Sequence, residues 1–222
     1  MEDLAMKNTT ILEMINNGQI EQLKDLLTKE IYQDSLKGDS NAKKRYAAMK
    51  RYFKYEGSID KDCCKRPCKD VEVDNKYYNS FVDGYCFALT TESIDTLETF
   101  DKTKGDYLDM QNFVNFSMSK SVEKIDLNAV LAEAKSKGYK YKKAELSGGD
   151  YQYVFKYRDD SYKLGLIDKA FSIINDGNPA EVYYNGKLSV LLFKTSIGIA
   201  GVMPMKSMKN INETKTVIKI EN

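Results

Sequence analysis

Basic side chains dominate the segment from Lys43 to Lys54, which contains six lysines and arginines and no acidic residue. At about 100° per residue in a helix, Lys43, Lys50 and Lys54 gather on one side. Lys44 and Arg51 widen this basic face. Such a face attracts a polyanion, with an affinity that falls steeply as salt rises. The alternative is the solvated face of an ordinary surface helix, which the residues by themselves favour.

Histidine is absent, so the sequence lacks the commonest general base and the commonest metal ligand. A Ser or Cys nucleophile would need Lys, Asp or Glu as its base. The paired acids Asp159-Asp160 lie in a turn-like context, where Asp is expected for backbone reasons. Gly148-Gly149 lacks the Lys-Ser or Lys-Thr that follows in a phosphate-binding loop. We expect a non-catalytic protein without a cofactor; a metal-dependent enzyme that uses carboxylates is the less favoured alternative.

The four cysteines are Cys63, Cys64, Cys68 and Cys86. A neighbouring pair cannot easily close a useful disulfide, so reduced thiols in a cytoplasm are the simplest interpretation. A zinc site is the alternative, but the paired C-x2-C spacing of such sites is missing. The first ten residues have no apolar core, and no run approaches the roughly 18 apolar residues that span a bilayer. We therefore expect a cytoplasmic protein without a membrane partner.

Length and composition predict one sizeable folded domain, with an extension. The 222 residues are 42% hydrophobic and 30% charged, and 34 basic residues nearly balance 33 acidic ones. A globally basic nucleic-acid binder is excluded, but a local basic face is not. Residues 37–69 contain 11 bases and four acids, whereas residues 70–126 contain five bases and 12 acids. The charge is thus divided between a basic and an acidic stretch.

Helical patterns open the chain. Apolar residues recur at helical spacing from Thr10 to Leu36, interrupted at Asn16-Asn17-Gly18, which predicts two short helices joined by a turn. Residues 38–41 break the pattern and offer an N-cap for the basic helix, predicted over residues 42–55. Further helices are expected over residues 126–137, with a stop at Gly138, and over residues 166–175.

Alternating and short apolar runs predict that the rest of the body is mostly β. The expected strands are residues 71–73, 77–90, 117–122, 151–157, 181–184, 188–193, 197–202 and 216–220, with turns at 74–75, 147–150 and 158–161. Alternating strands separated by turns favour an α+β protein with a largely antiparallel sheet.

Two segments carry motifs that occur in the same order in a known family. The first is RPCKDVEV (residues 66–73) followed by FVDGYCFAL (residues 81–89), and the second is residues 166–206, which end in GIAGVMPMK (residues 198–206). The first resembles the "rP-x-L-x-G-v" and "A-T-D-G-H-R-L-A" strands of the bacterial β sliding clamp of DNA polymerase III, and the second resembles its closing helix, hairpin and "M-P-M-R" strand. YKLGLIDKA (residues 162–170) resembles the entry to that helix. The resemblance covers residues 42–207. It implies a DNA-clamp-like domain of two β-α-β-β-β halves, whose helices at residues 42–55 and 166–175 would line the inside of a ring. Residues 1–41 would be a helical extension and residues 208–222 a polar tail.

The resemblance also implies two binding surfaces. The basic helix would contact duplex phosphates without reading bases, through Lys43, Lys44, Lys50, Arg51 and Lys54. An apolar groove would bind short peptides of replication proteins. The matching positions are Asp83, Gly84, Tyr85, Cys86, Phe87, Val202, Met203, Pro204, Met205 and Lys206. Exposed Met beside an aromatic side chain suits an adaptable peptide pocket. Without the resemblance, the residues themselves favour a place in the core for Phe87, Met203 and Met205.

This sequence departs from the family at several points. Tyr85 and Cys86 replace the His and Arg of D-G-H-R-L, and Lys206 replaces the final Arg. The family builds its groove from two adjacent domains, and this chain has about one. A ring would need a homo-oligomer of about six copies. Such a shortened protein suits a phage or mobile element. The alternative is a monomeric interaction protein that regulates or decoys replication without encircling DNA, with the basic helix covered by the extension.

Overall fold

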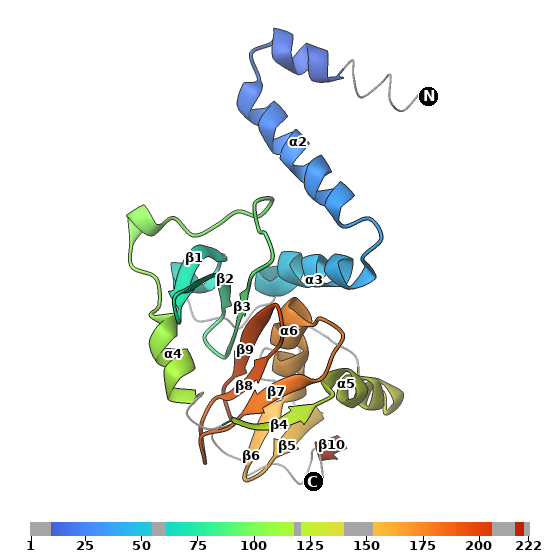
Figure 1. Cartoon of the computed structure of the whole chain (residues 1–222), viewed down its shortest axis with the longest axis vertical. Helices are drawn as coiled ribbons and strands as arrows, with labels where there is room; N and C mark the ends of the chain where they lie inside the picture. The colour runs from blue at the N-terminus through green and yellow to red at the C-terminus, as the bar shows by residue number, and fades with distance from the viewer. Residues whose placement is uncertain (1–9, 55–60, 118–120, 140–152, 206–215, 220–222) are drawn as a thin grey trace.

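The protein is an α+β structure built on two sheets, seen here in a computed structural model (Figure 1). The structure describes residues 10–54, 61–117, 121–139, 153–205 and 216–219. One sheet has seven strands in the order β1-β2-β3-β9-β8-β7-β4, all of them antiparallel to their neighbours. The other has the order β10-β5-β6. The strands are β1 (Cys68–Val73), β2 (Lys76–Val82), β3 (Cys86–Thr90), β4 (Ser121–Ile125), β5 (Tyr153–Tyr157), β6 (Asp160–Lys163), β7 (Ala180–Tyr183), β8 (Leu191–Lys194), β9 (Gly198–Val202) and β10 (Thr216–Lys219).

The large sheet contains the same arrangement twice, a helix followed by three antiparallel strands. Helix α3 (Ser40–Arg51) precedes β1, β2 and β3, and helix α6 (Leu164–Ile174) precedes β7, β8 and β9. The last strands of the two halves, β3 and β9, pair in the middle of the sheet, and α3 packs against α6. The halves are not complete β-α-β-β-β units. Within residues 10–54, helix α2 (Ile20–Ser35) precedes α3 where a strand is expected, and β6 before α6 belongs to the small sheet.

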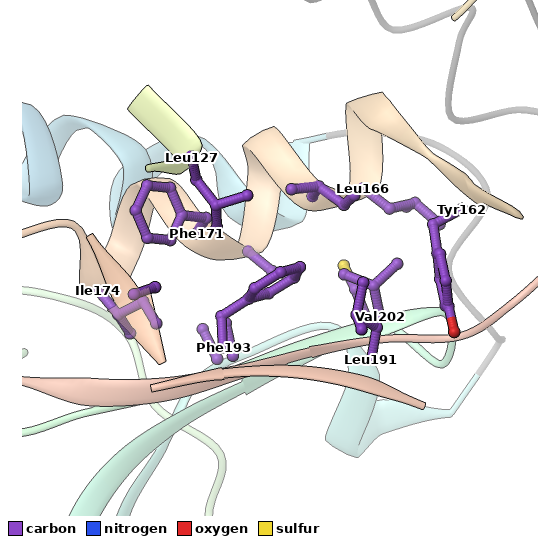
Figure 2. Close-up of a cluster of buried hydrophobic side chains, with 14 of the residues drawn as sticks. Leu127, Tyr162, Leu166, Phe171, Ile174, Leu191, Phe193 and Val202 are labelled. Carbon is purple, nitrogen blue, oxygen red and sulfur yellow. The ribbon is translucent and has the colours of Figure 1, made fainter. Parts of the chain in front are cut away.

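Helix α6 lies in the centre of the core. Its sequence LGLIDKAFSII is apolar on nearly every side, and a helix of that kind is buried on all sides. Figure 2 shows α6, which carries Leu166 and Phe171, packed over the face of the sheet from which Leu191 and Phe193 of β8 project. The rings of Phe171 and Phe193 meet edge-on, with centroids 6.5 Å apart. The family resemblance implied that this helix would line a DNA channel together with α3, but ten of its eleven residues are buried, so α6 presents no basic face of its own.

Residues 10–35 form a helical arm that extends away from the sheets (Figure 1). Residues 10–16 are helical, a turn at residues 17–18 follows, and α2 continues the arm, which confirms the two expected helices. Ile20, Leu27 and Ile31 on α2 are exposed. At the base of the arm, the ring of Tyr32 meets that of Tyr46 on α3 edge-on at 4.8 Å.

Several local signals give the expected elements. Asp39 caps α3 by accepting hydrogen bonds from the backbone N–H groups of Asn41 and Ala42. Helix α5 (Leu127–Ser136) begins after the cap Asp126 and ends before Gly138, whose φ is 94°. Strands β7, β8 and β9 overlap the three expected runs, and β10 lies in the strand expected at residues 216–220, where it pairs in parallel with β5.

Other expectations were wrong. The predicted strand over residues 77–90 is two strands, because a turn at residues 83–85 separates β2 from β3. Helix α4 (Met110–Ser117) was not expected, and the strand expected at 117–122 is β4, which begins at Ser121. The predicted turn at 147–150 lies outside the described residues. None of the described helices is long and apolar enough to cross a membrane.

Candidate functional site

The two segments that carry the family resemblance meet at one edge of the central strand pair. Strands β3 and β9 pair with Cys86 opposite Val202 and Phe87 opposite Gly201. The pairing continues one step beyond the strands, since the backbone N–H of Met203 donates to the carbonyl of Tyr85 over 2.9 Å. The groove residues of the resemblance are therefore brought together within a single domain.

An apolar pocket of about 260 Å³ opens at this point. Three large side chains stand at its mouth, with exposed fractions of 47% for Tyr85, 40% for Phe113 and 41% for Met203. The pocket is lined by Lys61, Cys64, Val82, Gly84, Tyr85, Cys86, Phe87, Leu108, Met110, Phe113, Val190, Gly201 and Met203. Exposed apolar side chains around a concave apolar surface are typical of a site that binds a ligand or partner.

The predicted groove residues divide into those that line this pocket and those that do not. Five of them line it: Gly84, Tyr85, Cys86, Phe87 and Met203. Asp83 and Val202 are buried beneath it, Pro204 and Met205 are half-buried beyond its lining, and Lys206 lies outside the described residues. Sequence reasoning missed the wall formed by Leu108 and by Met110 and Phe113 of α4. The spacing of Met110, Phe113 and Val114 is helical, and this short pattern was the available signal.

Gly201 in the pocket lining leaves room for the side chain of Phe87. A Cβ atom at Gly201 would lie 2.6 Å from Cζ of Phe87 and 2.8 Å from Cδ2 of Leu192, closer than side-chain atoms approach. The ring of Phe87 occupies the space that a side chain at Gly201 would need. A residue with no side chain therefore allows the aromatic ring to lie flat against β9.

Asp83 holds the lip of the pocket in place. Its Oδ1 accepts hydrogen bonds from the backbone N–H groups of Tyr85 and Cys86, both over 2.8 Å, which fixes the turn that presents Tyr85. Its Oδ2 forms an ion pair with Nζ of Lys169 on α6. The two side chains are only 5% and 4% exposed. The lip is thus tied to the core helix by a buried ion pair that joins residues 86 positions apart.

The buried ion pair also contacts the end of the basic helix. Lys169 Nζ lies 4.2 Å from the centre of the Tyr52 ring, and the Tyr52 hydroxyl donates to the carbonyl of Cys86 over 3.0 Å. Tyr52 directly follows α3. Burial, and then the Asp83 carboxylate, raise the pKa of the Cys86 thiol well above its usual value, so this thiol is protonated near neutral pH. Contacts between protein groups satisfy this cluster, which therefore has a structural role beneath the pocket.

The cysteines around the pocket are buried thiols. Burial, followed by the effect of the neighbouring Cys63, raises the pKa of Cys64 to about 11, and burial also raises the pKa of Cys68. Within the described part of the chain, which includes all four cysteines, no group of three or more His, Cys, Asp or Glu could hold a metal ion.

The basic residues of α3 point to the surface. Lys43, Lys44, Lys50 and Arg51 are exposed, and the side chain of Lys54 lies outside the described part. Arg45, the sixth base of the segment, is buried and donates to Oε1 of Glu92 over 2.6 and 3.0 Å. The arm touches α3 at Tyr46 and leaves the four exposed cations uncovered, although the regulator hypothesis expected it to cover them.

Comparison of the chain with protein-family models, with curated proteins and with solved structures finds no match.

Proposed function

We propose that the chain is a non-catalytic, clamp-like protein that binds short apolar peptides of replication partners in the Tyr85–Met203 pocket and duplex DNA on the basic face of α3. The observation that carries the proposal is the pocket itself. Two segments more than 100 residues apart, each resembling a clamp motif, pair as neighbouring strands and line one apolar pocket. A peptide with aliphatic and aromatic side chains matches the chemistry of this pocket.

The surface of α3 supports the DNA-binding half of the proposal. Its exposed cations comprise three lysines and one arginine, with no acidic residue between Ser40 and Arg51. Lysines and arginines on one helix contact backbone phosphates without base specificity, which suits a protein that moves along DNA. The doubled helix-plus-three-strands arrangement is also compatible with a clamp-like domain.

The burial of α6 favours a second candidate function. A chain that presents one basic helix instead of two has less surface with which to surround DNA. A monomer that retains the peptide pocket and binds replication proteins without encircling DNA would act as a regulator or decoy. Solution mass in the presence of DNA separates this candidate from the clamp-like one.

A peptide-binding experiment tests the pocket. The probe is a short fluorescein-labelled peptide with adjacent leucine and phenylalanine side chains, measured by fluorescence anisotropy. Met203→Lys places a charge at the mouth of the pocket, where Met203 is already exposed, so the variant retains its fold. We expect its affinity to fall about tenfold or more, since the apolar contacts are replaced by a desolvated ammonium.

The matched control is Tyr77→Lys, which also replaces an exposed large side chain with a lysine but lies on β2 outside the pocket. This control should bind the peptide as the unmodified protein does. Equal binding by all three proteins would place the peptide elsewhere on the surface and contradict the assignment of the pocket.

A further inference from the structure

A second hollow of about 470 Å³ lies where helices α3, α5 and α6 meet, and we call it the three-helix groove. It is separate from the peptide pocket, with which it shares no lining residue. Helix α6 lies between α3 and α5 (Figure 1) and forms the floor. The groove is lined by Asn41, Lys44, Arg45, Ala47, Arg51, Asn128, Leu131, Ala132, Lys135, Asp168, Ser172 and Asn175.

Each wall of the three-helix groove is a single stripe of a helix. Lys44, Ala47 and Arg51 follow the i, i+3, i+7 spacing on α3, and Asn128, Leu131 and Lys135 follow it on α5. The exposed residues Ala47 and Ala132 are small, so the space between the walls stays open. The cations Lys44 and Arg51 on one wall therefore lie across an open groove from Lys135 on the other.

Hydrogen bonds at both ends fix the relative direction of the walls. At one end, Arg45 of α3 donates to the carbonyl of Asn175 over 3.2 Å, and the Asn175 side chain donates to Asn128 of α5 over 2.6 Å. At the other end, Tyr139, which follows α5, donates to Asp168 of α6 over 3.1 Å, and the ring of Tyr52, which follows α3, lies 4.2 Å from Nζ of Lys169. Helices α3 and α5 therefore run in the same direction from the Asn175 end. Arg51 and Lys135 lie six and seven residues beyond Arg45 and Asn128, about 10 Å along each helix, and flank the far end.

The charge of the groove is positive. Four of its lining residues are basic and one, Asp168, is acidic. Arg45 is neutralised by Glu92, with which it forms an ion pair at 2.6 Å. Asp168 is buried in the floor and accepts hydrogen bonds from Tyr139 and Ser172, whereas Lys44, Arg51 and Lys135 are exposed at the rim. The two exposed rim lysines, Lys44 and Lys135, are therefore the charges that an incoming phosphate meets first.

We infer that the three-helix groove is a binding site for the sugar-phosphate backbone of one strand of duplex DNA, and that Lys135 contacts a phosphate across the groove from Lys44 and Arg51. This inference deepens the proposed DNA-binding function and rests on it. Under this inference DNA contacts the side of α3 that faces α5, with Lys44 and Arg51, and not the whole basic face of α3. The second helix that contacts DNA beside α3 is therefore α5, because α6 is buried.

Salt-dependent DNA binding tests the inference on the full-length chain. The dissociation constant for a labelled duplex is measured by anisotropy at several salt concentrations, for the unmodified protein and for Lys44→Ala, Lys135→Ala and Lys124→Ala. Lys124 is an exposed lysine on β4, outside the groove, so its removal is a control for the loss of one positive charge. Each lost phosphate contact should reduce the slope of log K against log salt by about 0.9.

We expect Lys44→Ala and Lys135→Ala each to have a slope smaller by about 0.9 than that of the unmodified protein, and Lys124→Ala to have an unchanged slope. Lys135→Arg keeps the charge and should restore the slope, which would separate a phosphate contact from a structural effect. If Lys44→Ala loses slope and Lys135→Ala behaves as Lys124→Ala does, the groove is not the binding site although α3 binds DNA. If the unmodified protein does not bind DNA at low salt, the proposed DNA-binding function itself fails.

Discussion

The buried ion pair between Asp83 and Lys169 gives the sharpest prediction about stability. Asp83→Asn keeps the size of the side chain and an oxygen that can accept from the backbone of Tyr85 and Cys86, but it removes the negative charge. The Lys169 ammonium then remains in the core with the Tyr52 ring as its neighbour. The variant therefore isolates the effect of leaving one buried charge without its counter-charge.

The expected loss is large because both partners are more than nine-tenths buried. Removing one partner of a buried pair costs about 3–5 kcal/mol of unfolding free energy. For a chain of this size, at about 2–4 °C per kcal/mol, that loss corresponds to a fall in Tm of about 6–20 °C. With a urea m-value of about 2–3 kcal/mol per M, the midpoint should fall by about 1–2.5 M.

A double-mutant cycle completes the experiment. Lys169→Met removes the positive charge, and the double variant with Asp83→Asn contains neither charge. Because the double variant contains no unpaired buried charge, it should be more stable than the two single losses added together would predict. Urea denaturation followed by circular dichroism measures all four proteins. If the two single losses simply add in the double variant, the charges do not interact and the reasoning is refuted.

Two further predictions concern the pocket floor and the basic helix. Gly201→Ala should lower the unfolding free energy by about 1–3 kcal/mol, because the added methyl group displaces Phe87. The control Gly105→Ala should leave the unfolding free energy unchanged, because the space around Gly105 is open. Urea denaturation measures both variants, and equal losses would contradict the overlap with Phe87. Asp39→Ala should lower Tm at neutral pH. The hydrogen bond from the Ala42 backbone holds the pKa of Asp39 below its usual value, so its stabilisation is complete above about pH 4 and is lost as pH falls through the lowered pKa. Melting curves against pH should show the two proteins converging in acid, and a constant difference would contradict this cause.

Local signals predicted the elements that depend on neighbouring residues. The N-cap offered by residues 38–41 and the Gly138 stop predicted the helices they flank, at α3 and α5. The Asp74-Asn75 turn was also readable, and both residues have the positive φ of a tight hairpin. Caps and turns depend on only a few consecutive residues, so they can be predicted from the sequence without knowledge of the tertiary structure.

Features that depend on distant residues were not predicted. The strand over residues 77–90 is divided because Asp83 turns the chain, and Asp83 is anchored by Lys169 far away in sequence. The pocket wall from α4 and the groove between α3 and α5 likewise arise from packing. The burial of α6 was readable from its apolar sequence, but the family resemblance directed attention to a surface role.

Light scattering in the presence of DNA tests the central claim most directly. The mass of the full chain is measured alone, with closed circular duplex and with linear duplex, at low and moderate salt. A clamp-like protein that engages DNA through α3 should form a complex at low salt that weakens as salt rises, and a sliding assembly should be retained on circular DNA and released from linear DNA. A chain that stays monomeric and ignores both DNAs even at low salt would contradict the account.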